Sequence, residues 1–439
     1  MKFRDVLLCC LLILPLLSPK AQTPAPPPTP NPAPSVIADI PVNYDEAKVG
    51  TYTLPDPLKL NNGKSVRDAK TWDTKRRPEI MEMFEAQQYG RAPGRPAGER
   101  FEVTETGPAF HGKAIRQQVT ISFSKDESWP RIHLLIYLPA AEHKPVPMFF
   151  TISFVAVQDA VDDPAISPDK IWDPKTNTRI SAPKGRGFGR INVEPLLDAG
   201  FGVATFYYGD VDPDYPSGFT NGIRAHYLKP GQTERAPDDW GSIAAWAWGM
   251  SRVEDYFETD KRIDSKRVAI HGVSRLGKTV MWAGAHDQRF AAVIASCSGE
   301  GGAALSHRNY GETIAHLTAP SRYPYQFAGN YAKYAGFPDT APMDANLLVA
   351  LIAPRPLLLQ TGSTDQWSDP KGEFLAAVAA GPVYKLLGKD GLDIDAWPAA
   401  NQAILHDLGY YMHEGGHGMV PGDWDVYIRF LKVHLYPEQ

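Results

Sequence analysis

Three residues in the second half of the chain have the types and the order that acyl transfer requires, namely Ser274, Asp365 and His417. A serine hydroxyl becomes a good nucleophile when an imidazole accepts its proton, and a carboxylate holds that imidazole in the correct tautomer. The nucleophile elbow, G-x-S-x, presents such a serine on a tight strand-to-helix turn and is followed by its acid and then its histidine. Residues 272–275 read G-V-S-R. We therefore predict Ser274 as the nucleophile, His417 as the base and Asp365 as the acid.

The residue after the serine adds a permanent positive charge. The tetrahedral intermediate of acyl transfer places negative charge on the former carbonyl oxygen, and hydrogen-bond donors must meet it. Arg275 could offer both its backbone N–H and its guanidinium to that oxygen. A fixed cation favours a substrate that is neutral until it is attacked, and an ester of a sugar acid fits that description.

The same segment supports a second interpretation, because residues 272–279 also fit the phosphate-binding loop, G-x-x-x-x-G-K-T. Both motifs need a strand before them and a helix after them. However, no later apolar run ends in the aspartate expected to hold magnesium, and the amino terminus predicts export, away from nucleoside triphosphates. We favour the elbow, although Leu276 stands where the elbow usually has its second glycine.

A zinc-protease interpretation competes for His417, since residues 413–417 read H-E-G-G-H and fit H-E-x-x-H. That motif needs a helix, so that its two histidines share one face, and two adjacent glycines cost a helix about 2 kcal/mol relative to alanine. Residues 408–412 instead resemble a strand that leads into a loop. We expect no metal here, while His413 and, less closely, His406 remain competitors for the role of base.

Each assignment also has a plainer alternative. Ser274 could cap the following helix, Asp365 could cap a turn, and His417 could be an ordinary surface residue. Singly these alternatives are commoner, but the joint occurrence of the three residues in the right order, each after an apolar strand, favours catalysis. Residues 210–214 read D-V-D-P-D, lack the glycine and glutamate of a calcium loop, and predict a polar turn.

The pattern of apolar residues indicates how these loops are held. Short apolar runs rich in β-branched and aromatic residues predict strands, and helical spacing predicts helices. The predicted strands are 132–138, 146–154, 201–208, 267–272, 290–296 and 356–361, and the predicted helices are 239–257, 276–286, 369–387 and 423–435. This alternation predicts a mainly parallel sheet with helices on both sides and an active site at the carboxyl ends of the strands. Along 239–257, Ile243, Trp246 and Met250 share one face, which we expect to pack on the sheet, whereas residues 36–130 show no clear period.

The amino terminus predicts export. Residues 1–22 have the features of a secretory signal peptide, with a basic start and an apolar run, 6–17, that is too short to cross a bilayer of roughly 30 Å. The segment 23–35 is rich in proline and predicts an extended linker, which leaves 36–439 as one catalytic domain. We therefore predict a secreted or periplasmic protein without stable insertion in a membrane.

Composition excludes several classes of protein. The 439 residues are 43% hydrophobic and 22% charged, as in a globular protein with a large core. The formal net charge of −5 argues against general binding of nucleic acid, which needs a basic surface. Cys9 and Cys10 lie in the predicted signal, so Cys297 would be the one cysteine of the mature chain and could form no internal disulfide. We expect a monomer.

The segment 272–278 resembles the G-x-S-R-x-G-K signature of the glucuronoyl esterases, carbohydrate esterase family fifteen. The resemblance extends over 239–241, 245–249, 298–305 and 311–313, and covers most of the chain from about residue 100 onward. It implies an α/β-hydrolase fold, a three-layer sandwich around a mainly parallel sheet. It also implies hydrolysis, without a metal or other cofactor, of the ester between 4-O-methyl-glucuronic acid on xylan and an alcohol of lignin.

The resemblance further implies roles for individual residues. Lys278 and Glu312 would bind the sugar hydroxyls, and Trp367 would form an apolar wall beside the nucleophile, the base and the oxyanion arginine. Read without the resemblance, Lys278 is a solvated helix residue and Trp367 an ordinary core aromatic.

Two departures from the fungal members point to the bacterial branch of the family. Fungal members carry their acid at the position that Cys297 occupies here, and a cysteine cannot serve as that acid. The acid must then be Asp365, as in many bacterial relatives, with Glu300 as the alternative. Fungal members also place a disulfide-bonded cysteine before the serine, where Val273 stands here.

The sequence thus predicts a serine esterase that acts on glucuronoxylan or lignin–carbohydrate esters through an acyl-enzyme on Ser274. The alternatives are another carbohydrate esterase, such as an acetyl xylan esterase, and a non-catalytic carbohydrate-binding protein of the same fold.

Overall fold

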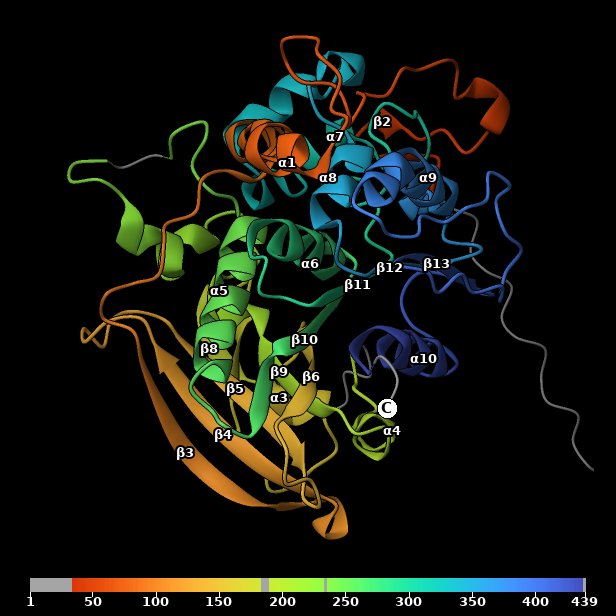
Figure 1. Ribbon diagram of the computed structural model, residues 1–439. Helices are drawn as coiled ribbons and strands as arrows, with labels where there is room; N and C mark the ends of the chain where they lie inside the picture. Colours follow the sequence, from red (N-terminus) through yellow and green to blue (C-terminus); the bar gives the residue numbers. More distant parts are fainter. Residues whose placement is uncertain (1–33, 183–188, 233–234, 437–439) are drawn as a thin grey trace, which may run out of the picture. The chain divides into compact units, whose positions relative to one another are not determined.

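A nine-stranded mixed sheet organises the part of the chain that the computed structural model describes, residues 34–182, 189–232 and 235–436 (Figure 1). The strands lie in the order β13-β12-β11-β10-β6-β9-β5-β4-β3. Their bounds are β3 Arg100–Ala109, β4 Ala114–Ser122, β5 Arg131–Pro139, β6 Val146–Ser153, β9 Gly202–Tyr207, β10 Ile263–Val273, β11 Ala292–Ser296, β12 Leu357–Gly362 and β13 Leu408–His413. The predicted signal peptide, 1–22, and nearly all of the predicted linker, 23–35, lie outside the described residues.

The six strands from β13 to β9 run parallel to one another, and β5, β4 and β3 continue the sheet in antiparallel order. The predicted mainly parallel sheet is therefore confirmed, and each of the six predicted strands is present within a few residues of its expected bounds. Strands β3 and β4 fall in the region where the sequence showed no period.

Helices cover both faces of the sheet, as a three-layer sandwich requires. Helices α5, α6, α8 and α9 share one hydrophobic core with one face, and α3, α4 and α10 share another core with the opposite face. Their bounds are α3 Val157–Ala160, α4 Val193–Asp198, α5 Ser242–Phe257, α6 Arg275–His286, α8 Ala345–Ile352, α9 Pro370–Leu386 and α10 Asp423–Leu435. Within the described residues, none of the helices combines the length and the apolarity that a membrane-spanning segment requires.

Smaller elements surround this sandwich. The short helices α1 Ala69–Thr71, α2 Arg77–Phe84 and α7 Ile314–Thr318 lie on loops around the sheet, and two small hairpins stand apart from it. The hairpins pair β1 Val36–Ile37 with β2 Ile40–Pro41 and β7 Lys170–Asp173 with β8 Thr178–Ser181.

Helix α5 packs on the sheet through Ile243, Trp246 and Met250 as predicted, but its opposite side is covered too, since all of its residues are buried. The segment that precedes β3 covers the outer side of the helix, where Trp248 Nε1 donates a hydrogen bond to the carbonyl oxygen of Gly94 at 3.2 Å. The ring of Phe123, just after β4, packs against Trp248 with centroids 4.8 Å apart. Since this cover comes from the region without a clear period, the helix pattern alone could not reveal it.

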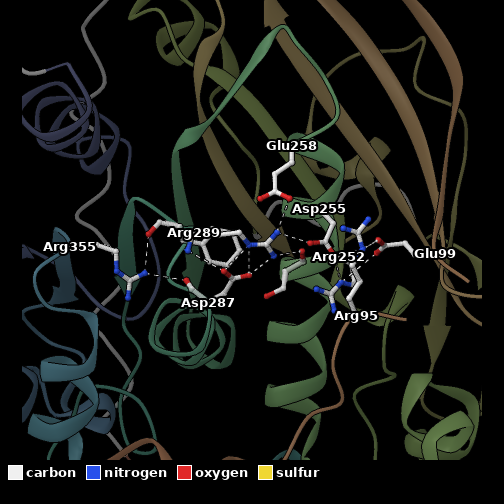
Figure 2. A network of polar contacts seen from close by, with 10 residues as sticks. Arg95, Glu99, Arg252, Asp255, Glu258, Asp287, Arg289 and Arg355 are labelled. Atoms are coloured by element: carbon white, nitrogen blue, oxygen red, sulfur yellow. Dashed lines mark hydrogen bonds and ion pairs between the residues drawn. The ribbon is translucent and has the colours of Figure 1, made fainter. Parts of the chain in front are cut away.

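A network of charged side chains ties the end of α5 to the loops around it (Figure 2). The Asp255 carboxylate accepts hydrogen bonds from Arg252 at 2.6 Å and from Arg289 at 2.7 Å. Arg289 also reaches Asp287, at 2.7 Å, in the loop after α6. The backbone carbonyl of Asp287 in turn accepts a hydrogen bond from Arg355, just before β12, so the network links α5, α6 and the neighbouring strand (Figure 2).

Candidate active site

Ser274 occupies a sharp turn between β10 and α6. Its backbone has φ 59° and ψ −127°, which places a non-glycine residue in a strained conformation of the kind found at functional sites. Its backbone N–H donates to the carbonyl of Ser296, at the end of β11, at 2.8 Å. The side chain makes no capping hydrogen bond to the helix, so the plainer interpretation of Ser274 as a helix cap is wrong.

Glycines on both sides of the serine allow this turn to form. A Cβ atom at Gly272 would lie 2.2 Å from the carbonyl oxygen of Leu276, and one at Gly277 would lie 2.7 Å from that of Ser296. Leu276, which replaces the usual second glycine of the elbow, is fully buried. Gly277, one residue later, makes the close approach. Because α6 already begins at Arg275, the segment forms an elbow and no open loop that could surround a phosphate.

Asp365 and His417 meet in the loops that follow β12 and β13. His417 Nδ1 lies 2.7 Å from Asp365 Oδ2 and 3.2 Å from Ser368 Oγ. The Asp365 side chain is buried, whereas 37% of the His417 side chain is exposed. Asp365 makes no capping hydrogen bond to the short helix after it. With Nδ1 held by the carboxylate, the imidazole offers Nε2 for proton transfer.

Ser274 and His417 line one cavity, of about 240 Å³. Among the hydrogen bonds of the described residues, His417 pairs with Asp365 and Ser368 and not with Ser274. Nucleophile–base contacts are commonly long in empty sites and tighten when substrate binds.

His413 is not available as the base. It ends β13, is buried, and pairs through Nδ1 with Asp423 at 3.1 Å, while its Nε2 lies 3.0 Å from the carbonyl oxygen of Gly416. Residues 413–417 form a strand end and a loop, so the two histidines do not share a helix face and the zinc-protease interpretation is wrong.

Arg275 directly follows Ser274 and has a fixed guanidinium. Nη1 is 2.5 Å from Asp214 Oδ2, and the guanidinium carbon lies over the ring of Tyr323, 4.6 Å from its centroid. Burial works against the charge, but Asp214, with smaller contributions from Tyr208 and Tyr323, more than offsets it, and the pKa of the Arg275 guanidinium lies above its ordinary value. The backbone N–H of Arg275 is the first of its helix and has no intrahelical acceptor, as at every helix start. Both donors are thus available near Ser274.

Asp214 belongs to the segment that the sequence predicted as a polar turn, with no role in the site. Besides Arg275, its carboxylate accepts hydrogen bonds from Tyr208 at 3.0 Å, from Tyr325 at 2.9 Å and from Gln326 at 2.7 Å. Four donors therefore fix one buried carboxylate next to the site.

The segment 210–214 is consequently more than the predicted polar turn. It follows β9, and its three carboxylates each pair with a different arginine. The pairs are Asp210 with Arg179 at 2.7 Å, Asp212 with Arg224 at 2.8 Å, and Asp214 with Arg275 at 2.5 Å. The alternation of aspartates was the available signal, but nothing local showed which cations they would meet.

Lys278 and Glu312 lie together on the wall of the cavity. Lys278 Nζ is 3.8 Å from Glu312 Oε2, and Arg322 donates to Glu312 Oε1 at 3.3 Å. Burial lowers the pKa of Lys278, and Glu312 opposes this shift. Lys278 is therefore buried rather than the solvated helix residue of the alternative interpretation.

Trp367 is half-buried and forms another wall. Its ring packs edge-on against His316 with centroids 5.2 Å apart, and Arg322 lies over it at 5.8 Å. The residues that line the cavity are Ser274, Arg275, Lys278, Cys297, Glu312, Leu317, Arg322, Tyr323, Gln326, Asp365, Trp367, Ser368 and His417. Arg322, Tyr323 and Gln326 come from a stretch after α7 in which the sequence showed no motif.

Glu300, the alternative acid, points elsewhere. Its Oε1 accepts hydrogen bonds from Ser306 at 2.6 Å and from Tyr331 at 2.8 Å, and burial raises its pKa to about 8. In the described part of the chain it makes no contact with His417. Cys297 lies much closer, because its Sγ and one polar atom each of Asp365 and His417 are all within 4.8 Å of one another.

Comparisons with known proteins show which proteins this chain is similar to. A family model described as "Glucuronyl esterase, fungi" matches residues 233–388. "Carbohydrate esterase MZ0003", from an unknown prokaryotic organism, is 44% identical over 403 residues, which cover 90% of this chain and 92% of that protein. The 4-O-methyl-glucuronoyl methylesterase of Cerrena unicolor is 27% identical over 363 residues, 80% of this chain and 65% of that protein. The solved glucuronoyl esterase from Solibacter usitatus has 44% sequence identity and a TM-score of 0.84 over 89% of this chain and 100% of its own.

Proposed function

The chain belongs to the glucuronoyl esterase family, and we propose that it hydrolyses esters of glucuronic acid or 4-O-methyl-glucuronic acid through an acyl-enzyme on Ser274. The observation that carries the proposal is the 2.7 Å contact between His417 and Asp365 in the cavity that also holds the elbow serine. In glucuronoxylan such esters join the sugar acid to alcohols of lignin, and we propose these as the natural substrates.

The first half of the reaction forms the acyl-enzyme. Ser274 Oγ attacks the ester carbonyl carbon while His417 Nε2 takes the hydroxyl proton. Asp365, on Nδ1, stabilises the imidazolium that results. Negative charge gathers on the former carbonyl oxygen, which the backbone N–H and the guanidinium of Arg275 meet. The intermediate then collapses, and the alcohol leaves with the proton that His417 returns.

The second half releases the sugar acid. A water molecule gives a proton to His417 and attacks the acyl carbon, and Ser274 leaves with that proton. Lys278 and Glu312, whose charged groups face the cavity, would hold sugar hydroxyls throughout. Trp367 would form the wall against which the sugar ring packs. The fixed charge of Arg275 stabilises the transition state more than the bound ester, because the carbonyl oxygen becomes anionic only when the ester is attacked.

We also propose that the protein is exported and acts as a monomer. The amino-terminal segment 1–22 supports export, and N-terminal sequencing of the protein recovered from culture medium or periplasm would check it.

The direct test offers purified protein the methyl ester of 4-O-methyl-glucuronic acid and follows release of the free acid. We expect hydrolysis by the native protein, and loss of about 10⁴-fold or more of kcat in Ser274→Ala, since the residues of a triad act as a unit. Acetylated xylan is offered in parallel. Faster release of acetate than of the sugar acid would support an acetyl xylan esterase instead, and no release by the native protein would leave a carbohydrate-binding role.

A further inference from the structure

Cys297 brings a thiol to the catalytic pair of His417 and Asp365. Its Sγ, one carboxylate oxygen of Asp365 and one ring nitrogen of His417 all lie within 4.8 Å of one another, and the three residues line the cavity of the nucleophile. They follow the ends of three neighbouring strands, β11, β12 and β13 (Figure 1). Hydrolysis uses the imidazole and the carboxylate and leaves the thiol without a role.

The thiol is held in place by the backbone around it. Sγ donates to the carbonyl oxygen of Gly418 and accepts from the backbone N–H of the same residue, each at 3.4 Å. The backbone N–H of Cys297 donates to the carbonyl oxygen of Gln360, in β12, at 2.6 Å. Because Gly418 directly follows His417, these contacts also fix the thiol relative to the imidazole.

A thiolate, an imidazole and a carboxylate together form a ligand set for zinc. Zinc binds these groups at about 2.0–2.3 Å in a tetrahedron, which water completes when the protein supplies three ligands. The ligand atoms of such a tetrahedron lie roughly 3.5 Å apart, so shifts of about 1 Å or less would bring the three groups into place. Hard cations such as Mg²⁺ prefer oxygen ligands and gain nothing from the thiol.

The charges around the three residues also suit a cation. Among the ion pairs of the described residues, Asp365 pairs with His417 alone, and no arginine or lysine neutralises its carboxylate. The cations of the cavity wall are paired with other carboxylates, namely Arg275 with Asp214, and Lys278 and Arg322 with Glu312. A bound metal ion would therefore meet a carboxylate that still lacks a permanent positive partner.

One other group of three such side chains occurs among the described residues, that of His133, Asp169 and Asp210, but it already holds its positive charges. Arg179 donates to Asp210 at 2.7 Å. Burial lowers the pKa of His133, but Asp169 and Asp210 raise it further, to about 10. A protonated imidazole has no lone pair for a metal, so this group provides a control.

We propose that Cys297, Asp365 and His417 form an inhibitory site for Zn²⁺. The metal displaces the thiol proton into solution and is bound by the thiolate, one carboxylate oxygen, one ring nitrogen and a water molecule. The base is lost whichever nitrogen binds. A metal on Nε2 occupies the lone pair that accepts the proton of Ser274, and a metal on Nδ1 moves the ring proton to Nε2.

The inference goes beyond the proposed function, because zinc binding can be measured without hydrolysis. Only the effect of zinc on the rate rests on that function. The zinc is no cofactor of the reaction, and its ligands differ from those of the zinc-protease motif, which pairs His413 with His417 on one helix.

The experiment titrates purified protein without an affinity tag with Zn²⁺ by calorimetry, and follows hydrolysis of the methyl ester of 4-O-methyl-glucuronic acid in parallel. We expect one Zn²⁺ to bind per chain and to lower kcat/KM by about 10²-fold or more at saturation, since the general base is lost. EDTA should restore the rate, and Mg²⁺ at the same concentration should have no effect.

Two variants locate the site. Cys297→Ser keeps the shape but replaces the thiol with a poor zinc ligand, so it should weaken zinc binding by about 100-fold or more, and the hydrolysis it retains should resist zinc. His133→Asn should bind zinc as the native protein does. Cd²⁺ tests the thiol in the native protein itself, because binding should produce near-ultraviolet absorption by charge transfer from thiolate to metal.

No zinc binding by the native protein, binding that Cys297→Ser leaves unchanged, or binding that His133→Asn abolishes would overturn the site. Undiminished hydrolysis with zinc bound would overturn its inhibitory role. If the native protein failed to hydrolyse the ester even without zinc, the proposed function would be refuted, while calorimetry and the cadmium absorption would still decide whether the site exists.

Discussion

Arg275 keeps its charge and its position because of one carboxylate. Asp214 holds Nη1 at 2.5 Å and is itself fixed by Tyr208, Tyr325 and Gln326, so the guanidinium cannot turn without breaking a buried network. Preorganised donors stabilise a developing oxyanion because they need no reorientation during the reaction. Asp214 therefore positions the group that we propose for the oxyanion, although it touches no reacting atom.

We expect Asp214→Asn to lower kcat by about tenfold or more and to change KM little, because the interaction strengthens only in the transition state. The measurement is a double-mutant cycle with Arg275→Met. If Asp214 acts through Arg275, Asp214→Asn should lower kcat only slightly when it is added to Arg275→Met. Asp210→Asn, in the same loop but paired with Arg179, is the control for loop damage. Additive losses in the cycle would show that Asp214 has a general structural role.

The site residues that the sequence could predict carry local patterns, whereas those it could not predict depend on contacts between distant parts of the chain. Ser274 carries a local motif, and Asp365 and His417 follow strands in an order that chemistry requires, so the sequence could predict that all three meet in one cavity. The contact between Asp214 and Arg275 joins residues from different loops and leaves no local pattern. The same holds for Arg322, which reaches the site through Glu312.

At the scale of elements, the elbow depends on how closely α6 approaches the end of β11. The first turn of the helix touches that strand at Gly277, where an added Cβ would lie 2.7 Å from the carbonyl oxygen of Ser296. A backbone carbonyl cannot move aside to relieve such a contact, as a flexible side chain could. The position of Ser274, one turn away, is therefore set by the absence of a side chain at residue 277.

We expect Gly277→Ala to push the start of α6 away from β11 and to lower the free energy of unfolding by roughly 1–3 kcal/mol. Because Ser274 moves with the helix, the change should affect mainly kcat, which should fall, and KM less. Urea unfolding and steady-state kinetics on the methyl ester would measure both effects. Gly381→Ala in α9 is the matched control, since nothing lies within 4 Å of its added Cβ. That change should stabilise by up to about 1 kcal/mol and leave kcat unaltered. Unchanged kinetics in Gly277→Ala would contradict this account of the elbow.

Strands and helices could be predicted where one clear pattern of apolar residues runs along the sequence. The buried parallel strands are continuous apolar runs, so β6, β9 and β12 were found. Strand β3 is an edge strand with mostly exposed or half-buried residues and with Gly107 and Pro108 near its end, a composition that reads as loop. Its partner β4 was missed with it. Helix α8 is short, almost wholly apolar and fully buried, so its sequence could not be told from that of a buried strand.

Across the whole molecule, several buried carboxyl groups are poorly compensated. Burial raises the pKa of Glu99 to about 7 and those of Glu254, Glu300 and Glu373 to about 8. Each of these groups binds its proton more tightly in the folded chain than in the unfolded chain. The folded state therefore gains from protonation at low pH and loses that gain as pH rises through these values. Together these groups predict that the melting temperature decreases as the pH rises from about 5 to about 9.

Glu254 offers the clearest test, because its side chain is fully buried and neither oxygen has a hydrogen-bond partner among the described residues. Burial raises its pKa from 4.5 to about 8, so this one group should lower the free energy of unfolding by up to about 1.4 kcal/mol per pH unit across that interval. Glu254→Gln keeps the shape without the charge. Its melting temperature should match that of the native protein near pH 5 and exceed it increasingly toward pH 9. Glu258→Gln, one turn along at the end of α5 and 44% exposed beside Arg289 (Figure 2), should show no such divergence. Parallel curves for the native protein and Glu254→Gln would mean that the carboxylate finds solvent or a cation when it ionises.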